Sequence, residues 1–240
     1  MEAESAGGRR AFIARLLALL PFVFPTVFLA VVFQKALHEV AGHGLMTLAV
    51  GGKFSGFQIC LTEASVSYRL PPAPCSPLQQ ALIGSSGIAV NVIFGLACLL
   101  SASWLRRESF LRFALMVLAG PSLLKGLSST FWGSFPRWGF GELKELFEFN
   151  PAASFRWSLI AASAAGLVAA TFIINLCIFQ FLEAWFGRQR NPRLLILALL
   201  GVLGLHQTLH LRLHLFHVSH HAHRHGAGLS GRLLRCRRLF

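Results

Sequence analysis

Apolar runs close to the length of a membrane-spanning helix recur along this 240-residue chain and limit its fold more than any other feature. A helix needs about 20 mostly apolar residues to cross the hydrocarbon core of a bilayer. Hydrophobic residues make up 55% of the chain and charged residues only 13%, a composition typical of membrane proteins. The runs lie at about 12–33, 79–104, 110–131, 157–183 and 194–217. We therefore expect an all-α fold, a multi-pass integral membrane helical bundle of about five to six spans.

The first run, at 12–33, is too long for the apolar region of a secretory signal and is followed by no small-residue cleavage pattern. We therefore expect an anchor that stays in the mature chain. The segment 36–50 is expected to be a further crossing or a re-entrant piece. The economical division of the chain is a single integral-membrane domain at 1–217 and a His/Arg-rich C-terminal tail at 218–240.

The formal net charge of +13 comes from basic residues whose positions fit such a bundle. Lys and Arg lie mainly in the short segments between the apolar runs and at the C-terminal end. This distribution is typical of topology signals in membrane proteins. The chain therefore has the lipid bilayer as its expected partner, and we expect no nucleic-acid partner.

The run His38-Glu39-Val40-Ala41-Gly42-His43 places three ionisable side chains inside an apolar segment. Ionisable residues in a membrane segment are costly and indicate a functional site. In the usual H-E-x-x-H helix, two imidazoles one turn apart bind zinc and the Glu acts as general base. Here the histidines are five residues apart, which on a regular α-helix separates them by roughly 140°. A π-bulge at this point would bring them back to one face, so we expect one.

The six residues "HEVAGH" resemble the H-E-x-x-G-H zinc motif of the dipeptidyl peptidase III family. The longer stretch "LHEVAGHGLMTLAVGGKF" resembles the motif helix of site-2 protease-type intramembrane zinc metalloproteases, which reads like "HELGHAL" and runs on to a Gly-Gly and a short sheet. The resemblance implies peptide-bond hydrolysis with zinc as cofactor. It implies His38 and His43 as metal ligands and Glu39 as the catalytic base.

A second stretch, "GSSGIAVNVIFG", is similar to the Gly-Pro-x-x-Asn pattern of the same family, although its proline is missing. The resemblance implies that Gly84 and Gly87 allow close approach to the motif helix and that Asn91 supports the site. The alternative is ordinary helix packing through small residues, with Asn91 as an interhelical hydrogen-bonding group.

The third metal ligand of the family is an Asp, and this chain contains no Asp. Glu142 follows Gly139-Phe140-Gly141, a flexible segment that could bring its carboxylate to the metal. We therefore expect Glu142 as the third ligand. For Glu145 and Glu148 we expect the solvated face of a short amphipathic helix over 142–149. The segment 53–68 predicts one or two short strands whose edge could hold an extended substrate by strand addition.

Histidines recur near the C-terminal end at the three- and four-residue spacing of one helix face. We interpret this stripe as low-complexity sequence, because no carboxylate accompanies it and Arg212 lies among the histidines. The residues are His206, His210, His214, His217 and His221. The sequence thus predicts an intramembrane zinc metalloprotease acting on a membrane-protein substrate. Two alternatives stay open: a catalytically inactive relative that binds membrane segments, and a metal-handling membrane protein that uses its His-rich tail.

Overall fold

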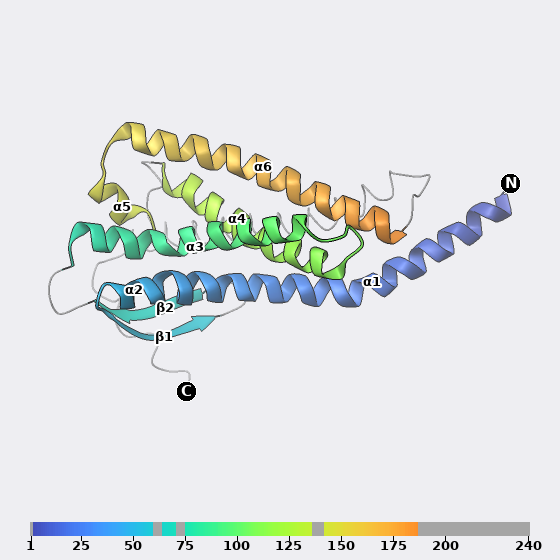
Figure 1. The fold of residues 1–240 in the computed structure, drawn as a ribbon, viewed down its shortest axis with the longest axis horizontal. Coiled ribbons are helices and arrows are strands. Elements are labelled where there is room, and N and C mark those ends of the chain that lie inside the picture. The colour runs from blue at the N-terminus through green and yellow to red at the C-terminus, as the bar shows by residue number, and fades with distance from the viewer. Residues whose placement is uncertain (1, 60–63, 71–74, 136–141, 187–240) are drawn as a thin grey trace, which may run out of the picture. The chain divides into compact units, whose positions relative to one another are not determined.

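The computed structural model describes residues 2–59, 64–70, 75–135 and 142–186, which form helices and one small sheet. Figure 1 shows these elements, all of which belong to one compact unit, Met1–Gln189. The helical elements are α1 (Glu2–Ala36), the π-helix η1 (Leu37–Gly44), α2 (Leu45–Ala49), α3 (Pro77–Ser103), α4 (Phe110–Gly133), α5 (Lys144–Phe149) and α6 (Ala153–Phe186). The strands are β1 (Lys53–Ile59) and β2 (Ala64–Arg69).

The first three helical elements follow one another without a break, so the apolar run at 12–33 and the segment 36–50 belong to one continuous helical stretch. The segment 36–50, expected to be a crossing or a re-entrant piece, thus continues the helix that begins in the first apolar run, and both lie in one candidate span, Pro21–Ala49. The physical reason is that residues 34–36 contain no helix breaker, and the helix ends only at the Gly51–Gly52 pair. Gly51 has a φ of 86°, a left-handed conformation that glycine adopts readily at a helix end.

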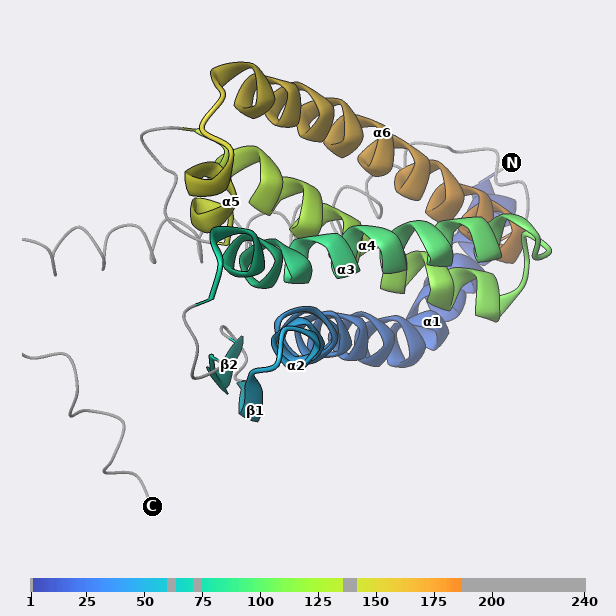
Figure 2. The same cartoon turned by 60° about the vertical axis from the view of Figure 1, so that its left-hand side comes forward.

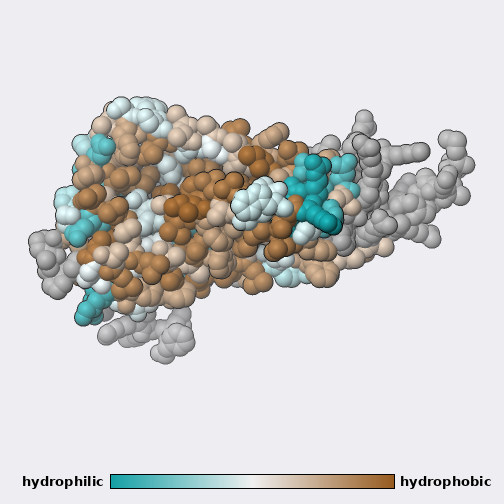
Figure 3. Space-filling view, viewed as in Figure 1, coloured by the Kyte–Doolittle hydropathy of each residue, from teal (hydrophilic) through white to brown (hydrophobic). Residues whose placement is uncertain are grey.

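Four helical stretches in the described part of the chain are long and apolar enough to cross a membrane: Pro21–Ala49, Pro77–Ser103, Phe110–Gly133 and Ala153–Ala184. They are compatible with an integral membrane protein, and Figure 3 shows hydrophobic residues over much of the middle of the visible face. The expected fifth run at 194–217, the domain boundary at 217/218 and the His-rich tail lie outside the described residues.

Helices α3 and α4 lie between α1 and α6, as Figures 1 and 2 both show. The start of α3 is encoded locally: Ser76 and Gln79 form a reciprocal capping box, and Pro77 occupies the first turn. Close packing of α3 on α4 depends on glycines. A Cβ on Gly95 would lie 2.5 Å from Leu123 Cγ, and one on Gly126 would lie 2.7 Å from Val92 Cγ2. Small residues that let backbones approach are typical of helix packing in membranes.

The strands β1 and β2 pair as an antiparallel hairpin, which confirms the prediction of one or two short strands at 53–68. The register pairs Lys53 with Arg69 and Phe54 with Tyr68, and it shifts between Phe54 and Gly56. The hairpin packs on the motif helix, because a Cβ on Gly44 would lie 3.0 Å from the Phe54 ring. The sheet therefore lies beside η1, where the candidate site is found.

The close α3–α4 contact gives a test of the fold. Gly126→Ala should destabilise the bundle by about 1–3 kcal/mol, because the new methyl group forces the two helices apart. Gly120→Ala on the same helix is the matched control. Its Cβ would lie 3.9 Å from the nearest atom, in Ile174, so the better helix propensity of Ala should leave stability unchanged or raise it by up to ~1 kcal/mol. Thermal unfolding in detergent micelles measures both, and a Gly126→Ala protein as stable as wild type would contradict the packing described.

Candidate metal centre

The motif residues form a π-helix, η1, over Leu37–Gly44. Its i→i+5 hydrogen bonding places residues five apart on one face, so His38 and His43 project together. Their ring centroids lie 5.0 Å apart with the ring planes at 81°. The predicted π conformation is confirmed, and it extends over the whole motif rather than a single bulged position.

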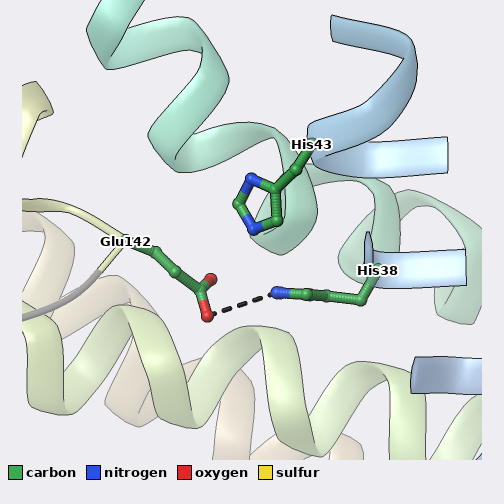
Figure 4. Close-up of side chains that lie close together, drawn as sticks. All are labelled: His38, His43 and Glu142. Atoms are coloured by element: carbon green, nitrogen blue, oxygen red, sulfur yellow. Dashed lines mark ion pairs between the residues drawn. The ribbon is translucent and has the colours of Figure 1, made fainter. Parts of the chain in front are cut away.

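Glu142, from the segment before α5, meets the two imidazoles, as Figure 4 shows. Its Oε1 lies 3.2 Å from His38 Nε2. One ligand atom from each of His38, His43 and Glu142 lies within 4.8 Å of the other two. Both histidines are buried, and they converge with the carboxylate from segments about 100 residues apart in sequence. This arrangement could hold a metal ion.

The backbone of α3 sets the orientation of His43. Its Nδ1 lies 2.7 Å from the carbonyl oxygen of Ile83, and because a carbonyl only accepts, the imidazole donates there. The proton is then on Nδ1, and the lone pair of Nε2 faces the other two groups. Metal-binding histidines commonly donate their second ring nitrogen to a carbonyl or carboxylate in this way. Thr47 fixes the same turn by donating to the His43 carbonyl oxygen at 2.7 Å.

Asn91 holds the second imidazole. Its Nδ2 lies 2.9 Å from His38 Nδ1, it is fully buried, and its Oδ1 has no hydrogen-bond partner. Turning the amide over would let Oδ1 accept a hydrogen bond from the His38 Nδ1–H group, and His38 Nε2 would then be free to act as a ligand. Asn91 can therefore hold the His38 imidazole in two states. In one state His38 Nε2 donates to Glu142, and in the other it would bind a metal ion.

Three glycines make this convergence possible. A Cβ on Gly87 would lie 2.6 Å from His38 Nε2 and 2.8 Å from His43 Nε2. A Cβ on Gly42 would collide with the backbone of Gly87, so the two glycines mark the closest approach of η1 and α3. Gly84 gives similar room to Glu142, whose carbonyl oxygen would lie 2.7 Å from a Cβ there. The sequence left two alternatives for Gly87 and Asn91, helix packing or support of the site. In the structure these residues do both.

The Glu142 carboxylate is suited to staying ionised. Burial alone would raise its pKa, but the hydrogen bond to His38 and the nearby basic side chains of His38, Lys125 and His43 outweigh burial. The net effect is a pKa below the ordinary carboxyl value. A carboxylate that keeps its charge near neutral pH can act as a metal ligand.

Glu39 is half-buried on η1 and does not belong to the group of potential ligands found among the described residues. Tyr68 on β2 is an exposed side chain whose pKa is raised, first by partial burial and then by the charges of Glu145 and Glu39. Sequence reasoning missed Tyr68. The signal that could have found it is that Tyr68 is the single tyrosine of the chain, in a strand that follows the motif.

Glu145 and Glu148, both expected on a solvated helix face, differ in their exposure to solvent. Glu148 is exposed and lies 3.7 Å from Lys144, as expected for a surface pair on α5. Glu145 is half-buried, and its Oε2 would lie 2.9 Å from a Cβ on Gly84. Glu145 is therefore less exposed than Glu148, because α5 packs on α3 at Gly84.

No protein-family model, curated protein or solved structure matches this chain. The residues and their geometry therefore carry the functional argument.

The position of Gly87 between the two imidazoles predicts that Gly87→Ala will weaken metal binding at least tenfold while the protein still folds. The added methyl group occupies space beside both Nε2 atoms and displaces the rings, and Ala favours helix. Ser85→Ala on the same helix is the control, because the Ser85 hydroxyl donates only to Ala81. Zinc titration against a competing chelator measures the affinity. Unchanged affinity in Gly87→Ala would show that the imidazoles do not share an ion.

Proposed function

We propose that this chain is a membrane-embedded zinc metallopeptidase that hydrolyses peptide bonds of membrane-protein substrates. The observation that carries the proposal is the convergence of His38, His43 and Glu142 inside an apolar bundle. The resemblance of the motif helix to site-2 protease-type metalloproteases supports the same conclusion, as does the placement of Gly87 and Asn91 against that helix.

The donor set fits zinc. Two histidine nitrogens and a glutamate oxygen, with one position open, form one of the usual ligand sets of catalytic zinc sites. Ligand distances of about 2.1 Å in a tetrahedral shell place two ligand atoms about 3.4 Å apart. The separation of 3.2 Å between His38 Nε2 and Glu142 Oε1 is close to this value. The buried Asn91 Oδ1 has no hydrogen-bond partner among the described residues, and it would accept from His38 Nδ1 once His38 Nε2 binds the ion.

A bound zinc ion would supply Lewis acidity, which polarises water and the carbonyl of the scissile bond. The protein's own part in the chemistry falls to Glu39. As general base, its carboxylate takes a proton from the attacking water and then delivers it to the leaving amine. Glu39 is adjacent to His38 and outside the ligand group, so its carboxylate remains free for proton transfer.

The substrate must present an extended backbone, because in a helix the peptide groups are occupied by their own hydrogen bonds. The β1–β2 hairpin lies beside η1 and forms a sheet of two strands, so it offers an edge near the site. A substrate strand added to that edge would gain backbone hydrogen bonds and lie alongside the motif helix. We therefore propose a membrane-protein segment, locally unwound, as the substrate.

Metal stoichiometry tests the ligand assignment. Protein truncated before His206 should retain about one zinc per chain, and His38→Ala, His43→Ala or Glu142→Ala should remove it or weaken it at least tenfold. Glu148→Ala is the matched control, because its carboxylate is exposed and pairs only with Lys144. The zinc content of purified protein after dialysis measures the outcome. A truncated protein that binds no zinc under zinc-replete conditions would refute the proposed centre.

Replacing the proposed base separates ligand from catalyst. Glu39→Gln keeps the size and hydrogen-bonding capacity of the side chain but cannot accept a proton. Zinc content should therefore be unchanged, while the rate of cleavage of a membrane substrate should fall by about 10²-fold or more. Loss of zinc in this variant would make Glu39 a ligand instead. Full zinc content in a wild-type protein that cleaves nothing would favour the inactive relative.

A further inference from the structure

Lys125 places an ammonium group within a helix that is long and apolar enough to span a membrane. It lies in α4, on the candidate span Phe110–Gly133, and its side chain is half-buried. Ionisable groups at such positions are costly, so they normally have a partner inside the protein. Within the described part of the chain, however, the Lys125 side chain forms no ion pair or hydrogen bond. Its backbone carbonyl accepts from Ser128 Oγ at 3.2 Å.

The position of Lys125 along α4 brings it to the candidate metal centre. The next residue, Gly126, packs on α3 so closely that a Cβ there would lie 3.3 Å from Asn91 Cβ. Asn91 in turn contacts His38. Further along α4, a Cβ on Gly133 would lie 3.3 Å from Cδ1 of Leu143, the residue after Glu142. Helix α4 therefore runs along the site from Asn91 to the residue after Glu142, and Lys125 lies on this part of the helix, although sequence reasoning had left it out.

The carboxylate of Glu142 has one oxygen engaged and one free. Oε1 faces His38, whereas Oε2 is buried and has no hydrogen-bond partner in the described part of the chain. A buried carboxylate oxygen without a donor is destabilising, and carboxylates that bind metals are usually hydrogen-bonded in turn. The Lys125 charge acts on this group, since it is one of the charges that lower the pKa of Glu142. An unpaired cation and an unpaired anionic oxygen thus share the same region of the bundle.

We propose that Lys125 is the positioning residue for Glu142: its Nζ donates to Oε2 and thereby holds Oε1 toward the two imidazoles. The flexible four-carbon stem of lysine allows Nζ to close the remaining distance. The pairing itself needs no metal. Its effect on zinc rests on the proposed function.

A double-mutant cycle tests the pairing. Lys125→Met should weaken zinc binding by about tenfold or more, while Lys125→Arg, which keeps the charge and the donors, should retain most of the affinity. In a Glu142→Gln background, Lys125→Met should have no further effect, because the residue acts through Glu142.

The electronic spectrum of the cobalt(II)-loaded protein should change in Lys125→Met and should match that of wild type in Lys125→Arg. Arg112→Met is the control for removing a cation from the same helix, since Arg112 donates to Gln180 instead.

The four proteins of the cycle are wild type, Lys125→Met, Glu142→Gln and the double variant. Measured without metal, they give a readout that does not depend on zinc. Their melting temperatures should be non-additive, because each single variant leaves the other charge unpaired. If Lys125→Met fails to fold, adding Glu142→Gln should restore folding for the same reason. Additive melting shifts, or unchanged zinc affinity in Lys125→Met even where activity is lost, would overturn the inference. A wild-type protein that binds no zinc would refute the proposed metal centre, and the metal-free cycle would still decide the pairing.

Discussion

The site depends on one geometric constraint, the five-residue spacing of His38 and His43. In an α-helix this spacing would turn the imidazoles roughly 140° apart, whereas the π-helix η1 places them on one face. The π-helix packs against α3 at Gly42 and Gly87, where any larger side chain would collide. Local backbone conformation and helix packing therefore act together, because the contact that brings the helices close also leaves room for the imidazoles.

The helix η1 provides the two imidazoles of the centre, and α3 and the segment before α5 provide the polar groups that contact them. Ile83 and Asn91 of α3 orient the two imidazoles, and Glu142 faces His38 from the other side. These polar contacts lie in a bundle of mainly apolar helices, where an unpaired donor or charge is most costly. Two groups of the centre still lack a hydrogen-bond partner among the described residues, Asn91 Oδ1 and Glu142 Oε2. The first would accept from His38 Nδ1 in the metal-bound form, and the second would accept from Lys125.

Much of this arrangement is readable from sequence, and the exceptions have physical causes. The apolar runs, the π conformation and the hairpin follow from residue periodicity and from the H-E-x-x-G-H spacing. Glu142 was chosen by elimination in a chain without Asp, and the structure places it beside His38. The continuity of the motif helix was missed because charge clusters suggested extra crossings. Tyr68 and Glu145 were missed because their approach to the site depends on how the hairpin and α5 pack, which no local pattern encodes.

X-ray absorption at the zinc edge, on full-length protein carrying one equivalent of zinc, tests the central claim most directly. The account predicts two imidazole nitrogens and oxygen donors at about 2.0–2.2 Å, with no sulfur. That shell corresponds to His38, His43 and Glu142 with an open position. A shell of three or more imidazoles would contradict the account, because it would place the ion on histidines other than the pair that the π-helix brings together.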